Sequence, residues 1–142
     1  METQPHFREL LRLLEKNKVE YVIVGGYAVS FHGYPRFTKD IDIFFRNENE
    51  NIQRVKKSLV EFGFPGSDLD EALFREPGNI IQFGISPLRV DIINEIDGVG
   101  FDEAVANRVR GRYGDIEVNF IGRVELIKNK KLDKFLTPEE AK

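Results

Sequence analysis

The sequence has no cysteine and no tryptophan, and it has only two histidines among its 142 residues. The lack of cysteine excludes a disulfide framework, a thiolate zinc site and a cysteine nucleophile. The two histidines, His6 and His32, are too few and too far apart to indicate a zinc site. We therefore expect a protein of a reducing compartment, the cytoplasm, whose chemistry depends on other residue types.

Long apolar runs are also missing from the sequence. No run approaches the length of about 18 residues that a membrane-spanning helix needs, so no membrane partner is expected. The first residues lack the basic and apolar regions of a signal peptide. The net charge of -3 argues against a wholly basic surface that coats nucleic acid. Basic residues nevertheless gather near the C-terminus, at Arg123, Lys128, Lys130, Lys131 and Lys134.

The remaining composition is that of an ordinary globular protein, with 41% hydrophobic and 32% charged residues. A chain of 142 residues suits one domain, residues 1–142, with one core. The residue pattern predicts helices at 5–17, 27–32, 50–62, 101–107 and 124–131. It predicts strands at 19–24, 40–45, 79–85, 88–93, 108–113 and 116–121, with hairpins at Ser86-Pro87 and Gly114-Asp115. The expected fold class is α/β (α+β), with helices covering one side of a small, mixed and mostly antiparallel sheet.

Two aspartates, Asp40 and Asp42, stand one residue apart in the apolar segment 39–45. Side chains alternate between the two faces of a strand, so both carboxylates would share one face at a separation of about 7 Å. Like charges on a largely apolar strand repel each other, and burial adds to the free-energy cost. A divalent cation that prefers oxygen ligands, Mg²⁺ or Mn²⁺, would offset this cost. The alternative interpretation is a strand face open to solvent.

A third aspartate, Asp91, lies in the apolar segment 88–93 and shares a strand face with Arg89. One interpretation pairs Asp91 with Arg89 or with another local cation. If this segment lies beside strand 40–45, Asp91 joins the first two carboxylates. Three convergent carboxylates could hold one or two divalent ions, orient a triphosphate and help to deprotonate an attacking hydroxyl.

Other residues near the acids suit a phosphate-rich substrate. Gly25 and Gly26 follow a predicted strand and precede a predicted helix, where the backbone can approach a ligand closely and the helix N-terminus favours anions. A plain turn is the alternative interpretation.

Cations also flank the first two acids. Arg36 and Lys39 could neutralise phosphate charge, and Thr38 could hydrogen-bond a phosphate oxygen, unless this segment is a solvated loop. Lys130 in the last predicted helix could reach the same pocket, although a solvated helix face is the alternative for it.

The segment from Val22 to Ile43 contains the ordered pattern GG-x-A, HG and R-x-T-x-D-x-D. This segment resembles the opening signature of the minimal nucleotidyltransferases of the DNA polymerase β superfamily. The nearest branch includes the AbiEii-like toxin nucleotidyltransferases and uncharacterised relatives. Asp91, between Val90 and Ile92, resembles the third acidic position of the family, and Lys130 resembles the lysine of its closing helix.

The resemblance implies a fold, an activity and a set of roles. It implies transfer of a nucleoside monophosphate from a nucleoside triphosphate to a hydroxyl acceptor, with release of pyrophosphate. Asp40, Asp42 and Asp91 would bind Mg²⁺ or Mn²⁺, Asp91 would also activate the acceptor hydroxyl, and Gly25 and Gly26 would hold the triphosphate. The sequence does not identify the acceptor, which could be a small molecule, an RNA end or a protein.

Two other functions are compatible with the same residues. The protein could be an antitoxin-like module that binds a nucleotide or a partner without turnover, or a metal-dependent nuclease. Members of the family usually continue past the closing-helix lysine with segments that help to form the acceptor site. We therefore consider a homodimer or a partner protein possible here.

Overall fold

The computed structural model describes residues 3–34, 39–84 and 87–131. Within these ranges the helices are α1 (Pro5–Lys16), α2 (Gly25–Phe31), α3 (Asn49–Phe62), the 3-10 helix η1 (Gly66–Asp68), α4 (Glu71–Arg75), α5 (Phe101–Ala106) and α6 (Arg123–Lys131). The strands are β1 (Tyr21–Val24), β2 (Asp40–Phe45), β3 (Ile80–Phe83), β4 (Arg89–Ile93), β5 (Val109–Tyr113) and β6 (Ile116–Phe120).

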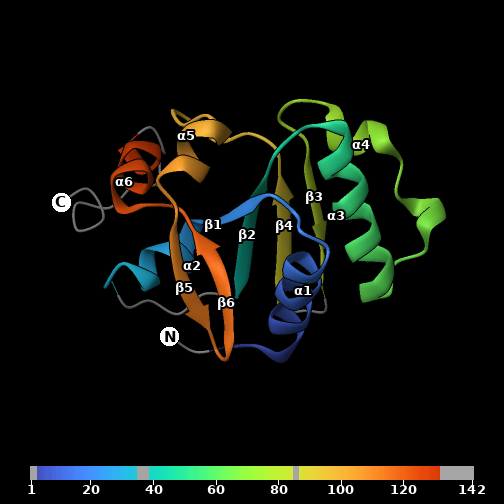
Figure 1. The fold of residues 1–142 in the computed structure, drawn as a ribbon, viewed down its shortest axis with the longest axis horizontal. Helices are drawn as coiled ribbons and strands as arrows, with labels where there is room; N and C mark the ends of the chain where they lie inside the picture. Colours follow the sequence, from blue (N-terminus) through green and yellow to red (C-terminus); the bar gives the residue numbers. More distant parts are fainter. Residues whose placement is uncertain (1–2, 35–38, 85–86, 132–142) are drawn as a thin grey trace.

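The strands form one mixed sheet in the order β3-β4-β2-β1-β6-β5 (Figure 1). Three of the five pairings are antiparallel, and the pairings of β1 with β6 and of β2 with β4 are parallel. The predicted fold class, a small and mostly antiparallel mixed sheet with helices packed on it, is therefore confirmed. The two predicted hairpins join β3 to β4 and β5 to β6.

Helices pack on both faces of the sheet, which corrects the prediction that they cover one side. Phe44 and Phe45 are neighbours in β2, so their side chains point to opposite faces. Phe45 packs against Phe74 of α4, with ring centroids 6.2 Å apart, and Phe44 packs against Phe101 of α5 at 5.1 Å. Both Phe44 and Phe45 are buried, so this end of β2 is covered on its two faces.

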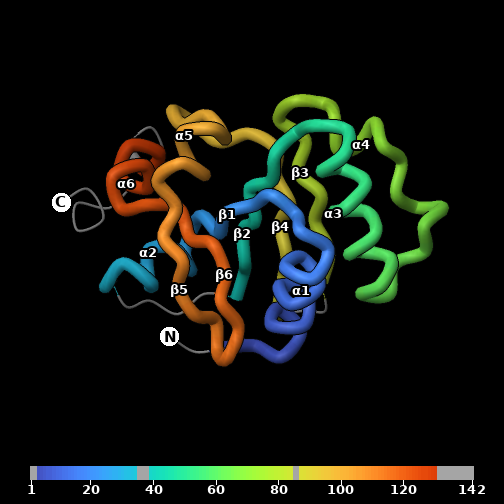
Figure 2. Tube along the Cα trace, in the orientation of Figure 1, coloured from blue at the N-terminus to red at the C-terminus, as the bar shows by residue number. Residues whose placement is uncertain are grey.

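The face of the sheet that carries Phe45 is covered mainly by the pair α1 and α3, which run side by side (Figure 2). The buried side of α1 consists of Phe7, Leu10, Leu11, Leu13 and Leu14. This includes the predicted stripe at helical spacing. At the end of α1, Asn17 Nδ2 donates hydrogen bonds to Ser58 Oγ and to Glu61 Oε1 of α3. These hydrogen bonds link the end of α1 to α3.

The sequence pattern missed two short helices, η1 and α4, between α3 and β3. η1 has three residues and α4 has five, which is too few for an apolar period to show. The start of α4 does carry a local signal, because the side chain of Asp70 accepts a hydrogen bond from the backbone N–H of Ala72 at 3.0 Å. In the part of the chain that the structure describes, no helix has the length and apolarity to cross a membrane.

Candidate active site

The three predicted acids come together because β2 and β4 are parallel neighbours. In the register of this pair Asp42 lies opposite Asp91, and Asp40 lies opposite Arg89. Asp40 and Asp42 share one face of β2, and the register puts Asp91 on the same face of β4. The condition that the sequence left open, strand 88–93 beside strand 40–45, is thus met.

Asp42 and Asp91 form the buried part of this acidic face. The residue Asp91 is only 8% exposed, and Asp42 is partly buried. Burial raises the pKa of Asp42 to about 7, with further increases from the charge of Asp91, from a hydrogen bond between the two side chains and from the charge of Asp40. Arg89 opposes these effects. Without a cation, burial and crowding therefore disfavour full ionisation of this face near neutral pH.

Arg89 bridges two of the three acids. Its Nη2 lies 3.0 Å from Asp40 Oδ2, and its Nε lies 3.0 Å from Asp91 Oδ1. Nη2 also donates a hydrogen bond of 3.3 Å to Asp91 Oδ2. The buried Asp91 Oδ1 accepts no hydrogen bond from any described residue, so its contact with Nε is an ion pair without hydrogen-bond alignment. Both sequence interpretations of Asp91 hold together, since it converges with the other acids and also pairs with Arg89.

Gly25 makes room for Asp42. Its φ is 68°, a backbone conformation that residues other than glycine rarely adopt. A Cβ built on Gly25 would overlap Asp42 Oδ2. Helix α2 begins at Gly25 itself rather than at Tyr27, so the double glycine is the first part of the helix and not a separate turn. Whether Gly25 and Gly26 also contact phosphate stays a prediction.

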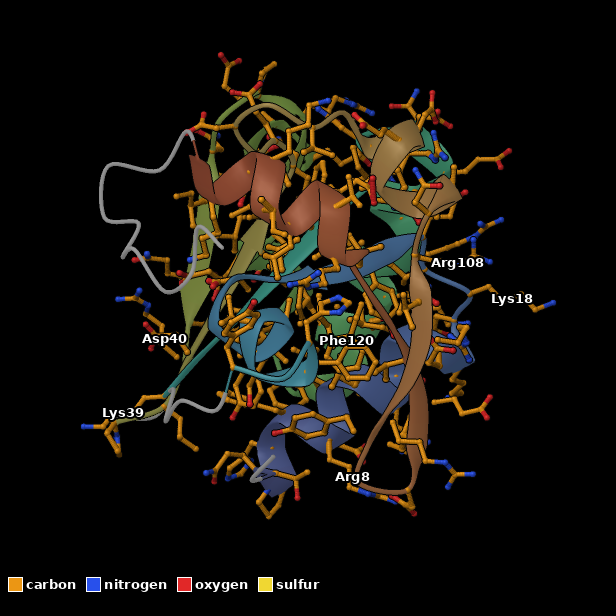
Figure 3. The ribbon with its side chains drawn as sticks, turned by 90° about the vertical axis from the view of Figure 1, so that its left-hand side faces the viewer. Arg8, Lys18, Lys39, Asp40, Arg108 and Phe120 are labelled. Carbon is orange, nitrogen blue, oxygen red and sulfur yellow. The ribbon has the colours of Figure 1, made fainter. Side chains whose placement is uncertain are left out.

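The predicted cations divide into described and undescribed positions. Arg36 and Thr38 lie outside the described residues. Lys39 is exposed beside Asp40, with its side chain extending away from the molecule (Figure 3). Lys130 is half-buried on α6. The roles of these four residues in nucleotide binding stay predictions.

An open hollow lies next to the acidic face, at the β3–β4 hairpin. Its volume is about 360 Å³, and it is lined by Asp40, Gln82, Phe83, Gly84, Pro87, Leu88 and Arg89. Gln82 of β3 lies opposite Asp91 in the antiparallel register, so its amide shares the face of the acids. Sequence reasoning missed Gln82, although it is the one polar residue between Ile80 and Phe83. A substrate group at this hollow would meet both Asp40 and Arg89.

Residues 3–131 match the sequence profile of a family described as nucleotidyl transferases of unknown function. The chain belongs to this nucleotidyl transferase family. The match spans every residue that the structure describes and includes all three acids. The resemblance drawn from the residues alone is therefore confirmed at the level of nucleotidyl transfer.

Solved structures support the same fold. One similar structure is a nucleotidyltransferase candidate from Thermotoga maritima, with a TM-score of 0.58, 16% identity, and coverage of 85% of this chain and 80% of that chain. Another is the antibiotic-resistance factor ANT(2'')-Ia, with a TM-score of 0.56, 15% identity, and coverage of 96% and 76%. At these identities the likeness concerns the fold. No curated protein matches the sequence significantly.

The donor atoms of this nucleotidyl transferase fit a hard divalent cation in their chemistry. They are carboxylate oxygens, and one of them, Asp91 Oδ1, is buried and accepts no hydrogen bond from the described residues, although it forms an ion pair with Arg89. These oxygens do not form a complete set of metal ligands in this structure. Within the described ranges, no group of three or more acidic or histidine side chains is placed to hold a metal ion. Arg89 is the cation that Asp40 and Asp91 contact instead.

Proposed function

We propose that this protein transfers a nucleoside monophosphate from a nucleoside triphosphate to a hydroxyl acceptor and releases pyrophosphate, in a reaction that depends on Mg²⁺ or Mn²⁺. The observation that carries the proposal is the parallel pairing of β2 and β4, which aligns Asp42 with Asp91 on one face of the sheet beside Asp40. Membership in the nucleotidyl transferase family supports the reaction class.

Asp40, Asp42 and Asp91 would hold the cation. When bound, a divalent cation neutralises the phosphate charge that develops during transfer. The acceptor oxygen forms a bond to the α-phosphorus, the bond from that phosphorus to the bridging oxygen breaks, and pyrophosphate leaves with the electron pair. The hydroxyl proton would pass to a carboxylate of this face, and the family resemblance assigns that role to Asp91, which lies opposite Asp42 in the strand register.

The nucleotide would lie along the acidic face, with phosphates near the start of α2 and toward the hollow beside Asp40. Arg36, Thr38, Lys39 and Lys130 are candidates for additional phosphate contacts. A second copy of the chain or a partner protein could complete the acceptor site. The relation to toxin–antitoxin systems and the cytoplasmic location remain expectations from the sequence.

The test is transfer from the four α-labelled nucleoside triphosphates with Mg²⁺, using wild type, Asp42→Asn and Asp91→Asn. The acceptors are tRNA, lysate protein and small metabolites, each tested as a separate fraction. We expect labelled product with wild type only, and a loss of about 100-fold or more in each variant, since both acids act on the reacting phosphate. The fraction that carries the label identifies the acceptor class.

A matched control is Asp115→Asn, which removes an exposed carboxylate paired with Arg8. Asp115 lies between β5 and β6, at the opposite edge of the sheet from β3 and β4. This variant should transfer at the rate of wild type. Full activity in Asp42→Asn would contradict the proposal. Binding of Mg²⁺ and nucleotide without transfer to any fraction would favour the non-catalytic binding module.

A further inference from the structure

Arg89 stands between two acids that the proposed reaction assigns to a cation. The parallel register places it directly opposite Asp40, and it lies two residues before Asp91 on the same strand face. Its guanidinium contacts Asp40 Oδ2 through Nη2 and Asp91 Oδ1 through Nε, each at 3.0 Å. One planar group thus joins two carboxylates from neighbouring strands.

The charges of this face explain why such a bridge forms. Asp40, Asp42 and Asp91 would carry three negative charges on two adjacent strands if all were ionised, and like charges this close repel each other. The planar fork of arginine can contact two carboxylates at once, which the point charge of lysine does less well. Arg89 therefore offsets part of the negative charge of this face, as a divalent cation held by these carboxylates would.

The contact of Arg89 with Asp40 is exposed, whereas its contact with Asp91 is largely buried, since the Asp91 side chain is 11% exposed. The Arg89 side chain is 49% exposed and that of Asp40 is 40% exposed, and ion pairs of such exposure are weak. Arg89 also lines the open hollow together with Asp40 and Gln82. Movement of the guanidinium into the hollow would break an exposed contact with Asp40, but at Asp91 it would leave a buried carboxylate that needs another positive charge.

We propose that Arg89 is a displaceable internal counter-ion, which yields the carboxylate oxygens of Asp40 and Asp91 to the divalent cation and then pairs with a phosphate of the nucleotide. This inference rests on the proposed function, because it needs a cation and a nucleotide at the acidic face. It makes Arg89 a competitor of the cation before the nucleotide binds and a ligand of the nucleotide afterwards.

The test is Mn²⁺ binding measured by the loss of the free-ion electron paramagnetic resonance signal, with no nucleotide present. The variants are Arg89→Gln, which removes the guanidinium, and Arg89→Lys, which keeps the charge and loses the fork. We expect Arg89→Gln to bind Mn²⁺ about tenfold or more tightly than wild type, because the competing charge is gone. Arg89→Lys should also bind more tightly than wild type, by a smaller factor.

Two controls separate bridging from net charge. Lys39→Gln removes an exposed positive charge next to Asp40, and Arg12→Gln removes an arginine paired with Glu9 on α1. Neither should tighten Mn²⁺ binding as much as Arg89→Gln. If Lys39→Gln has the same effect as Arg89→Gln, or if Arg89→Lys binds like wild type, general charge explains the result and the proposal is wrong.

The second part of the proposal concerns the nucleotide. In saturating Mn²⁺, Arg89→Gln should bind a non-hydrolysable triphosphate analogue several-fold more weakly than wild type, since one phosphate contact is lost. Equal or tighter analogue binding would overturn this part. Thermal unfolding shows whether the variant is folded. A folded Arg89→Gln unfolds in a cooperative transition, and added Mn²⁺ should raise its melting temperature more than that of wild type.

Failure of the inference is distinguishable from failure of the proposed function. If wild type binds Mn²⁺ and Arg89→Gln binds it equally or more weakly, Arg89 is a supporting ion pair and only this inference fails. If neither wild type nor Arg89→Gln binds Mn²⁺, the cation site itself is wrong and the proposed function fails with it.

Discussion

The two faces of the strand pair β2 and β4 differ sharply although they belong to the same backbone. One face is apolar and at most 3% exposed, and it consists of Ile41, Ile43, Val90 and Ile92. The other carries the acids Asp40, Asp42 and Asp91 beside Arg89. The first face stabilises the fold, by about 1.5–3 kcal/mol for each buried side chain. The second face lowers stability through repulsion and desolvation, and it places the reactive groups. A rigid pair of strands thus supports a site that would not be stable alone.

Neighbouring residues on the two faces should respond to mutation in opposite directions. Ile43→Ala leaves a cavity in the core and should lower the free energy of unfolding by about 2–5 kcal/mol. Asp42→Asn removes a carboxylate from a crowded acidic face, and without divalent ions at pH 8 it should raise that free energy, by an amount on the order of 1 kcal/mol. Urea unfolding followed by circular dichroism measures both changes.

The gain in Asp42→Asn should depend on pH. The pKa of Asp42 is raised to about 7 in the folded protein, whereas an unfolded aspartate titrates near pH 3.9, as a rough reference. Between these values the folded state binds more protons than the unfolded state, so the stability of wild type falls as the pH rises from about 4 to 7. This fall should be smaller in Asp42→Asn, and the advantage of the variant should vanish near pH 3.5. A constant difference across this range would mean that the pKa of Asp42 is not raised in the folded protein, by burial or by the neighbouring carboxylates.

Gly25→Ala should weaken the contact between α2 and the acidic face. An alanine at a φ of 68° costs about 1–2 kcal/mol, and its Cβ would also overlap Asp42 Oδ2. We expect a lower free energy of unfolding in Gly25→Ala than in wild type. In the Asp42→Ala background the same change should cost less, because most of the overlap is removed. Equal costs in both backgrounds would show that the backbone conformation alone matters at Gly25.

The sequence predicted the strands that carry the three acids better than the contacts around them. Alternation along 40–45 and 88–93 was enough to place the acids on defined strand faces, and all six strands were predicted. The pairing of β2 with β4 is a long-range contact, so no local pattern could reveal it; the family signature was needed to anticipate that Asp91 joins Asp40 and Asp42.

The rest was beyond the sequence for physical reasons. The helix that carries Phe101 was predicted, but its packing on Phe44 is a long-range contact that no local pattern reveals. The bridge from Arg89 to both Asp40 and Asp91 requires the exact register of two strands. The close approach of Gly25 to Asp42 joins the start of α2 to β2, and a glycine pair by itself indicates only conformational freedom.

The most direct test of the acidic face as a cation site is urea unfolding at pH 8 with and without Mg²⁺, at matched ionic strength, for wild type and Asp42→Asn. A ligand that binds only the folded state at about 100 times its dissociation constant stabilises by about 2.7 kcal/mol. We predict that Mg²⁺ raises the unfolding midpoint of wild type and leaves that of Asp42→Asn nearly unchanged. An equal response of both proteins, or no response of wild type, would contradict a cation held by Asp40, Asp42 and Asp91.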